Sequence, residues 1–249
     1  SIREMYEKGK KWSLEYFETI YKLLGTKFFA YYFESQVGKV GLDIVQEGLK
    51  KGIFEQSQGA IIFPGEKYGL HTRVFVSAQG LPTYEAKELG LAPTKYKDFK
   101  YALSVIVTGS VGIDFFWVLL IVLEQIYPDL AQKTRHIAHG MVRLSEGKMS
   151  SRTGNIMTAE ELIRGVKDRV SQIVDSLGSK IPERDKGDTE EKIALGAIKY
   201  SFLKGNLGRD IVFDVEKSLS LDGDSGPYLQ YAYARCKSIL SKLSLAKFQ

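Results

Sequence analysis

The 249-residue sequence contains one cysteine and three histidines, and it has no long apolar run. Cys236 has no second cysteine to pair with, so no disulfide can form within the chain, and a reducing compartment such as the cytoplasm is expected. We expect Cys236 to be a small residue buried on a helix. The longest apolar run, Phe115 to Leu123, is too short to span a bilayer and is bracketed by Asp114 and Glu124, so it predicts a buried helix.

The rest of the composition is that of an ordinary folded protein. Hydrophobic residues at 44% and charged residues at 26% exclude a disordered or fibrous chain. The length leaves room for two small domains, each with its own core, and two domains are expected. A net charge of +5 is compatible with a polyanionic partner such as RNA, but a mild lysine excess is also typical of a solubilising surface, so charge alone does not decide.

The pattern of the first part predicts an α/β arrangement. Helices are expected at 12–24 and 40–52, and short strands at 59–63 and 73–77. A β-branched strand at 103–108, the apolar helix to Ile126 and a strand at 137–144 follow in the order that a parallel crossover requires. Gly109 closes the first of these strands, at the sheet edge where open α/β folds bind ligands.

The second part is predicted to be helical throughout. Thr158 and Glu161 form a capping box before an apolar stripe that ends at Gly178. A charged linker at 181–188 then precedes helices expected at 189–204 and 227–245. We place the domain boundary after residue 157, which divides the chain into 1–157 and 158–249.

A loop of small and basic residues, Gly147-Lys148-Met149-Ser150-Ser151, lies between the last predicted strand and this capped helix. Small residues let backbone N–H groups approach phosphate oxygens. Lys148 adds a mobile positive charge where negative charge builds up during transfer at phosphorus. For the core Lys-Met-Ser alone, an ordinary basic loop is the alternative. The run, however, continues through Arg152-Thr153-Gly154-Asn155.

This run resembles the KMSKS signature of class I aminoacyl-tRNA synthetases, and its continuation to Asn155 resembles the form found in arginyl-tRNA synthetases. Chance agreement over nine residues is improbable. The resemblance implies that Lys148, Ser150 and Ser151 are catalytic and that Lys148 and Met149 contact ATP. In that family the amino-acid carboxylate attacks the α-phosphorus of ATP and pyrophosphate leaves. Ser151 stands where the signature has its second lysine. No residue is therefore assigned as the main positive charge that stabilises the leaving pyrophosphate.

Tyr84 and Glu88 lie four residues apart after a predicted strand-to-helix turn, and they would share one helical face. A carboxylate can accept two N–H bonds from a guanidinium group, and a phenol can pack beside the planar cation. An exposed helical turn with solvated carboxylates is the alternative. The stretch also resembles the arginyl family, where a Tyr and an Asp at this spacing recognise the substrate side chain. The resemblance implies that Tyr84 and Glu88 bind arginine, with Glu88 one methylene longer than the usual Asp.

A third position departs further from the family. After the strand ending at Gly109, arginyl enzymes usually carry a Glu-Gln pair whose glutamine contacts the substrate. Val111 and Gly112 stand there in this sequence, and neither has a polar side chain. Gly112 is thus the implied arginine-side position, and the glutamine contact is missing or supplied elsewhere.

His136-Ile137-Ala138-His139 resembles the other class I signature, HIGH, but we reject the match. It lies in a predicted strand, where positions three apart face opposite sides, and too few further ligands lie nearby for a zinc site. We expect a structural role for His136 and no dedicated metal site. The implied ATP-binding strand is His139-Gly140-Met141-Val142. No other HIGH-like motif occurs, so we expect a fragment that lacks the first half of the nucleotide-binding fold and is inactive alone.

The segment 226–240 resembles the helix that opens the anticodon-binding domain of arginyl enzymes. Tyr228, Tyr231 and Arg235 would form one stripe, which fits either a packed core face or a stacking platform with a phosphate-seeking cation. We expect packing for the two tyrosines and a tRNA contact for Arg235.

The expected fold is therefore α/β: the C-terminal half of a Rossmann-type parallel-sheet catalytic domain, followed by an all-α helical segment. The implied activity is that of an arginine–tRNA ligase, with arginine, tRNA and ATP with Mg²⁺ as substrates, no tightly bound cofactor and no membrane partner. A monomer is expected. Two alternatives stay open: a non-catalytic synthetase-like paralogue that binds RNA or partners, and another class I synthetase such as the cysteinyl enzyme, which the lack of zinc-spaced cysteines disfavours.

Overall fold

The computed structural model describes residues 1–144, 157–176, 178 and 181–246. The lysine-serine loop, with Lys148, Met149, Ser150 and Ser151, lies outside these residues. Two compact units are present, one formed by Phe28–Gly140 and the other by Ser1–Lys27 together with Met141–Gln249. These units are defined by the packing within each of them. The domain boundary expected after residue 157 stays a prediction.

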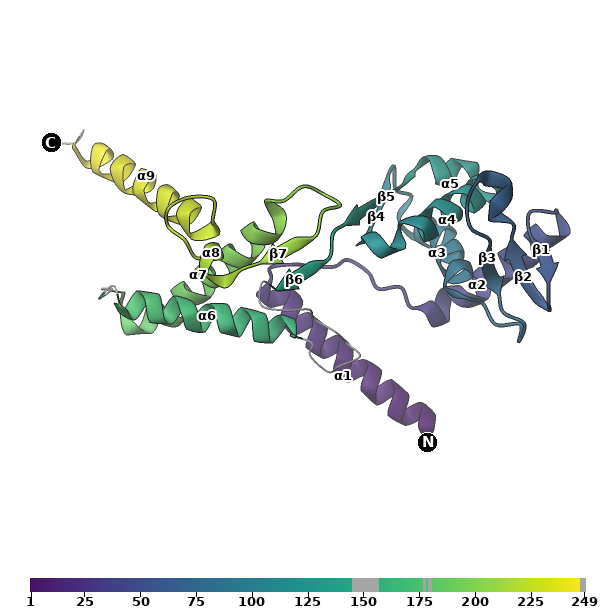
Figure 1. Ribbon diagram of the computed structural model, residues 1–249. Helices are drawn as coiled ribbons and strands as arrows, with labels where there is room; N and C mark the ends of the chain where they lie inside the picture. Colours follow the sequence, from purple (N-terminus) through teal and green to yellow (C-terminus); the bar gives the residue numbers. More distant parts are fainter. Residues whose placement is uncertain (145–156, 177, 179–180, 247–249) are drawn as a thin grey trace. The chain divides into compact units, whose positions relative to one another are not determined.

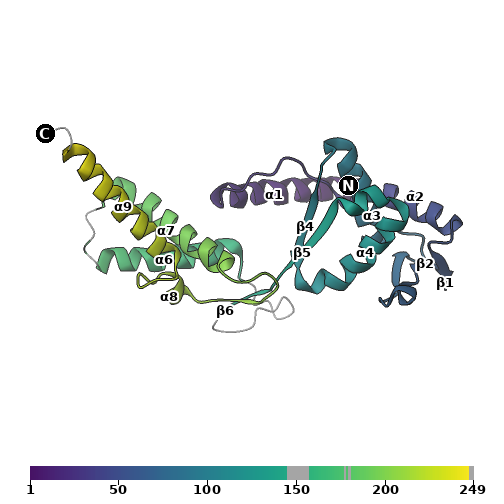
Figure 2. The same cartoon turned by 90° about the horizontal axis from the view of Figure 1, so that it is seen from above.

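The unit Phe28–Gly140 combines a group of helices with two small sheets (Figure 1). Its helices are α2 (Glu34–Lys50), α3 (Tyr84–Phe99), α4 (Ile113–Ile126) and α5 (Pro128–Gln132), with short 3-10 turns η1 (Gly65–Tyr68) and η2 (Ser110–Gly112). One sheet is antiparallel, in the order β1 (Glu55–Ser57), β2 (Ala60–Phe63), β3 (Arg73–Val76). The other is the parallel pair β4 (Ser104–Gly109) and β5 (Thr134–His139), which run side by side in Figures 1 and 2.

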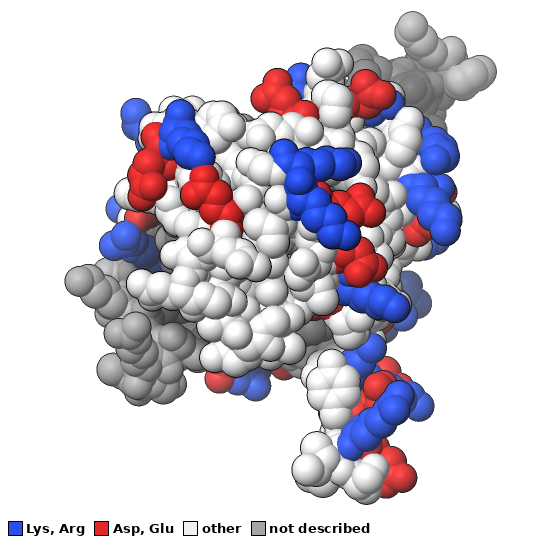
Figure 3. All heavy atoms as spheres, turned by 90° about the vertical axis from the view of Figure 1, so that its right-hand side faces the viewer, with Lys and Arg blue, Asp and Glu red and all other residues white. Residues whose placement is uncertain are grey.

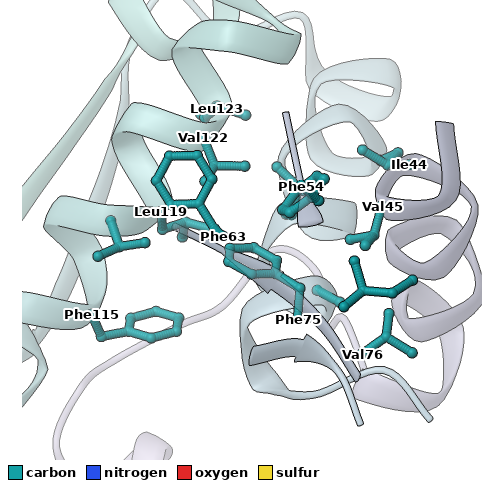
Figure 4. Close-up of a cluster of buried hydrophobic side chains, with 14 of the residues drawn as sticks. Ile44, Val45, Phe54, Phe63, Phe75, Val76, Phe115, Leu119, Val122 and Leu123 are labelled. Carbon is teal, nitrogen blue, oxygen red and sulfur yellow. The ribbon is translucent and has the colours of Figure 1, made fainter. Parts of the chain in front are cut away.

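The core of this unit gathers side chains from α2, the antiparallel strands and α4 (Figure 4). Phe54, Phe63 and Phe75 are almost fully buried, and their ring centroids lie 4.9 to 6.5 Å apart. Leu119 and Val122 of α4 belong to the same cluster. The apolar run of α4 is therefore explained by core packing: burial of such side chains contributes about 1.5–3 kcal/mol each.

The second unit is mainly helical. Its helices are α1 (Ile2–Leu23), α6 (Ala159–Ser176), α7 (Glu183–Leu203), α8 (Val215–Ser218) and α9 (Gly226–Ala246), and a two-stranded parallel sheet joins β6 (Val142–Leu144) to β7 (Ile211–Phe213). Val166, Ala194 and Phe213 form the centre of its core. The end of α1 is tied to α7, because Lys199 Nζ donates to the Leu24 carbonyl at 2.5 Å.

Several predictions from the sequence are confirmed. β4 and β5 are parallel and are separated in sequence by α4, as the crossover requires. The capping box is present: Thr158 N donates to Glu161 Oε2 at 2.7 Å, and Glu161 N donates to Thr158 Oγ1 at 3.2 Å. The last helix begins at Gly226 and runs to Ala246.

Other predicted boundaries are wrong, and contacts distant in sequence explain two of them. The strand expected at 137–144 is two strands in different sheets, interrupted at Gly140 and Met141. β7 lies in the part predicted to be helical throughout, because it pairs with β6, and three residues are too few to show a period. The first helix begins at Ile2 rather than residue 12. The linker at 181–188 is largely helix, since α7 begins at Glu183, directly after its N-cap residue Pro182.

Cys236 was expected to be buried and is exposed. It lies on α9, most of whose side chains are exposed within the described chain, so the helix offers no covered face at this point. None of the described helices combines the length and the apolar character needed to cross a membrane.

Candidate functional site

Tyr84 and Glu88 open α3, and the start of this helix is pinned to strand β3. The Thr83 hydroxyl donates to the Val74 and Phe75 carbonyls at 2.7 and 3.0 Å, and Thr83 N also donates to the Phe75 carbonyl at 3.0 Å. These three bonds fix the turn that Gly80 initiates at a φ of +76°, a backbone conformation that favours glycine. The strand-to-helix turn expected from the sequence is thereby confirmed.

The Tyr84 and Glu88 side chains meet on one face of α3, as four-residue spacing on a helix predicts. A hydrogen bond joins the Tyr84 hydroxyl to the Glu88 carboxylate. Burial and then the nearby Glu88 charge raise the pKa of Tyr84 to about 12, so the phenol stays protonated at neutral pH and donates. Burial raises the pKa of Glu88 above its usual range, while the Tyr84 hydrogen bond and the charge of Lys95 act in the opposite direction.

Three carboxylates lie near this helix start, and among the described residues two of them have a close cation while Glu88 has none. Glu34 of α2 pairs with Lys87 Nζ at 2.6 Å, and Glu85 pairs with the Arg73 guanidinium at 3.5 Å. Within the part of the chain that the structure describes, no ion pair within 4 Å is made by Glu88. Glu88 is thus the carboxylate here that can accept a cation from a ligand.

A row of aromatic rings connects α3 to the start of α4. The ring centroids of Tyr84 and Phe115 lie 4.8 Å apart, those of Phe115 and Phe116 also 4.8 Å, and the His136 ring of β5 stacks on Phe116 at 4.1 Å. His136 Nε2 lies 2.8 Å from Thr108 Oγ1 on β4. Burial lowers the pKa of His136, which together with these contacts supports the structural role expected for it.

Gly112 lies at the carboxyl edge of β4, where it precedes α4. A Cβ added there would approach Thr108 Oγ1 to 3.1 Å and the Phe116 ring to 3.7 Å. The Thr108 hydroxyl and the Phe116 ring therefore limit the free space at Gly112. Val111 is 85% exposed, and its side chain has no polar group. Tyr84, Glu88 and Gly112 belong to one unit and are connected through Phe115 and Phe116.

Two residues near this site were not singled out from the sequence. Thr108 carries the hydroxyl beside Gly112, and Lys95 lines the same cavity as Glu88, together with Ser104 and several apolar side chains. A signal for Lys95 was present, because seven residues are two helical turns and return to the same face as Glu88. No comparable signal existed for Thr108, whose role depends on the approach of α4 and β5.

The expected ATP-binding strand is divided between the two units, which separate after Gly140. His139 is exposed at the end of β5, and its Nδ1 lies 2.8 Å from the Gly140 carbonyl, which can only accept, so Nδ1 is the donor of this hydrogen bond. Met141 N donates to Asp210 Oδ1 at 3.0 Å, and the Met141 carbonyl accepts from Ile211 N at 2.8 Å.

Asp210 also pairs with Arg143 Nη2 at 2.6 Å, so one carboxylate holds two positions of the chain around Val142. Val142 itself pairs with Ile211 and packs on the helical core. Among the described residues no group of three or more His, Cys, Asp or Glu side chains is placed to hold a metal ion.

Arg235 lies on α9 with its guanidinium 5.8 Å from the centre of the Tyr231 ring. Tyr228 and Tyr231 are 39% and 52% exposed, so the packing expected for both is only partial within the described chain. Tyr231 also borders an apolar cavity of about 300 Å³ with Val170 and Leu219. The stripe predicted for Tyr231 and Arg235 is present as a cation–π pair on one exposed face.

The sequence matches the family described as "tRNA synthetases class I (R), catalytic domain" over residues 2–215. The chain therefore belongs to this family of class I tRNA synthetases, and the resemblance drawn from its motifs is confirmed.

Individual relatives agree with this assignment. The chain is similar to proteins named arginine–tRNA ligase from Borreliella burgdorferi (36% identity, 97% of this chain, 42% of the relative) and Flavobacterium psychrophilum (32%, 97%, 41%). It spans about 42% of the length of the curated relatives that it matches.

Solved structures confirm the fold class. The chain is similar to an arginyl-tRNA synthetase from Plasmodium falciparum, with a TM-score of 0.79 at 20% identity over 96% of this chain and 41% of that one. It is also similar to the Thermus thermophilus arginyl-tRNA synthetase, with a TM-score of 0.69 at 24% identity over 89% of this chain and 44% of that one. At these identities the likeness concerns the fold: part of a parallel-sheet α/β domain followed by helices.

Proposed function

We propose that the gene product containing this chain is an arginine–tRNA ligase, which uses ATP with Mg²⁺ to activate arginine and transfers the arginyl group to tRNA. In the first step an arginine carboxylate oxygen bonds to the α-phosphorus of ATP, and the bond to the β-phosphate oxygen breaks, which releases pyrophosphate. In the second step a hydroxyl of the 3′-terminal ribose of tRNA attacks the arginyl carbonyl, and AMP leaves. Family membership supports this activity, and the Tyr84–Glu88 pair supports arginine as the amino acid.

The observation that carries the proposal is the Glu88 carboxylate, which lies beside the Tyr84 phenol and has no ion-pair partner within 4 Å among the residues that the structure describes. A guanidinium group presents parallel N–H donors to a carboxylate, and such charge-assisted pairs are about twice as strong as neutral hydrogen bonds. Glu34 and Glu85 are already paired with Lys87 and Arg73, so they do not compete for the substrate cation. Tyr84 remains a neutral donor that orients Glu88 and offers a ring face to the planar cation.

The remaining site residues have supporting roles in this proposal. Gly112 stands in place of the usual glutamine side chain, close to the Thr108 hydroxyl, which a Cβ at this position would approach to 3.1 Å. Lys148, Ser150 and Ser151, with Met149, are assigned to the ATP phosphates from the signature alone. His139, Gly140, Met141 and Val142 are assigned to the adenosine side from the resemblance, and His139 and Gly140 stand at the carboxyl end of the parallel strand β5.

For the tRNA we propose a contact at Arg235, which is exposed and held against Tyr231. The proposal does not depend on a broad basic surface. On the face drawn in Figure 3, lysine and arginine side chains lie among acidic ones around a wide uncharged area. A monomeric, cytoplasmic protein is part of the same proposal.

Arginine binding to the 249-residue chain, measured by isothermal titration calorimetry, tests the central contact. Glu88→Gln is expected to lower the affinity by about 10- to 100-fold, because a hydrogen bond to a charged group contributes about 1.5–3 kcal/mol. Citrulline, which has a neutral urea group in place of the guanidinium, should bind the wild type and the Glu88→Gln variant with similar affinity. Glu85→Gln is the matched control on the same helix, and it should change arginine binding much less because Glu85 already pairs with Arg73. Equal losses for the two variants would reject Glu88 as the recognition residue.

Charging of tRNA with labelled amino acids by the whole gene product tests the activity itself. Arginine alone should be accepted, and Lys148→Ala should reduce the rate of adenylate formation, measured by pyrophosphate exchange with tRNA present. The second candidate, a non-catalytic paralogue, is favoured by the apolar Val111 and Gly112. Binding of tRNA without exchange or charging would establish it instead.

A further inference from the structure

A second charged group shares the cavity of Glu88. Lys95 lies two helical turns farther along α3, on the same face, and both side chains line one cavity whose remaining wall is mostly leucine, isoleucine and alanine. A charged group that is enclosed by apolar surface loses its hydration. This raises the free energy of the folded state unless a counter-charge lies near. The presence of one carboxylate and one ammonium group in this cavity therefore calls for a joint explanation.

The Lys95 ammonium is held in place from the strand side. Its Nζ donates to Ser104 Oγ at 3.0 Å at the start of β4 and lies 6.0 Å from the centre of the Tyr101 ring. Burial lowers the pKa of Lys95, and the negative charge of Glu88 counteracts this. Ser104 thus fixes the position of the Lys95 ammonium group, whose positive charge interacts with the negative charge of Glu88.

The other described groups that act on Glu88 do not provide a positive charge. Tyr84 donates a neutral hydrogen bond, and Glu34 of α2 adds a negative charge that disfavours ionisation of Glu88. Lys87 is paired with Glu34 at 2.6 Å. Ser104 and Thr134 from the two parallel strands, and Tyr101 between α3 and β4, also border the cavity and are uncharged at neutral pH. Among the groups that act on Glu88, Lys95 supplies the cation.

The distance between the two groups also matters. Within the described part of the chain Lys95 makes no ion pair within 4 Å, and its Nζ donates to Ser104 Oγ, so its charge acts on Glu88 across the cavity without occupying the carboxylate oxygens. An interaction between opposite charges falls only inversely with distance, and it is screened less inside a protein than in water. The oxygens of Glu88 stay available for a cation that enters from the Tyr84 side.

We propose that Lys95 is a positioning residue for ligand recognition: it is the built-in counter-charge that keeps Glu88 ionised and free to accept a guanidinium group. The proposal rests on the function proposed above, because it takes Glu88 to be the arginine-binding carboxylate. With Lys95 present, the site is ready for a cation before the ligand arrives. Without it, burial and Glu34 favour the protonated carboxyl, which offers one acceptor fewer and no charge to the ligand.

The direct test follows the ionisation of Glu88 by the ¹³Cδ chemical shift in the 249-residue chain. Lys95→Met removes the charge, Lys95→Gln removes the charge but keeps a donor for Ser104, and Lys95→Arg keeps the charge. The pH midpoint of the Glu88 titration should rise in both neutral variants and stay near that of the wild type in Lys95→Arg. Circular dichroism identifies any variant that does not fold, and either neutral variant can then serve alone. Coinciding midpoints in the wild type and a folded neutral variant would overturn the proposal.

Arginine titrations at several pH values give a second readout that a loss of packing would not produce. In the neutral variants the affinity should fall by about tenfold for each pH unit below the raised Glu88 midpoint, and it should recover at higher pH where Glu88 ionises again. A uniform loss at every pH would mean that Lys95 only supports the fold, which contradicts the proposal. If the wild-type chain binds no arginine, the contact proposed above between Glu88 and a guanidinium group fails, while the Glu88 titration still decides the role of Lys95.

Discussion

Gly41 of α2 lies against the carbonyl of Ala86 in α3 so closely that a Cβ at Gly41 would stand 1.8 Å from the Ala86 oxygen. Gly90 makes the same kind of approach from the other helix, with a Cβ that would lie 2.5 Å from the Val37 oxygen. Two helices can come this close only where neither carries a side chain at the crossing. Because Ala86 lies between Tyr84 and Glu88, the position of the candidate site depends on this contact.

Gly41→Ala is expected to destabilise the chain by about 1–3 kcal/mol, since the overpacked backbone must move apart. The midpoint of urea unfolding measures this. Gly38→Ala on the same helix is the control, because its Cβ would meet only the side chains of Pro82 and Lys87 at 3.5 and 3.7 Å, an ordinary contact. That variant should be neutral or more stable by about 0.5–1 kcal/mol, as expected for Gly to Ala in a helix. A Gly41→Ala variant as stable as Gly38→Ala would contradict the close approach.

Asp210→Ala should loosen the chain around Met141 and Val142. The variant loses the hydrogen bond to Met141 N and the ion pair with Arg143, and a cost of about 1 kcal/mol is expected because both partners are partly exposed. The specific readout is faster hydrogen exchange at the Met141 amide. Asp188→Ala removes the exposed pair with Lys192 on α7 and should leave that amide unchanged. Unaltered Met141 protection in Asp210→Ala would show that Ile211 alone holds this segment.

Thr158→Ala should destabilise the start of α6 by about 1 kcal/mol, because it removes the side chain that caps the Glu161 amide. Thr158→Ser keeps the hydroxyl and should retain most of the stability. The reciprocal bonds from Thr158 lower the pKa of Glu161, so their contribution is present above the unfolded pKa and is lost as the pH falls through the lower folded value. Thermal unfolding at neutral and acidic pH measures both effects, and the difference between the Ala and Ser variants should shrink in acid.

His136 should make the unit Phe28–Gly140 sensitive to mild acid. Burial lowers its folded pKa below the unfolded value of about 6.5, so the folded state binds fewer protons. Its contribution to stability is therefore fully present above the unfolded pKa and is lost as the pH falls toward the folded one. His136→Phe keeps an aromatic ring against Phe116 and should remove part of the decline in melting temperature between about pH 6.5 and pH 5. An unchanged decline in this variant would mean that other groups cause it.

Much of the local structure could be predicted because it depends on neighbours in sequence. The capping box at Thr158 and Glu161 involves residues three apart, and α4 is marked by its uninterrupted apolar run. The parallel pair β4 and β5 followed from the strand, helix, strand order. The strand β7 could not be predicted in this way, because its three residues become a strand only by pairing with β6, which lies about seventy residues earlier in the chain.

The sequence by itself determined the family, through its signature run and the spacing of Tyr84 and Glu88, and it placed these two residues on one helical face. Only the tertiary structure decided which carboxylate of the region is available to a ligand. Glu34 forms an ion pair with Lys87, which lies fifty-three residues later in the chain, and Glu85 forms one with Arg73 of β3. Glu88 faces Lys95 across an apolar cavity. Spacing along the chain sets which side chains share a face, but their charge partners depend on which segments pack against that face.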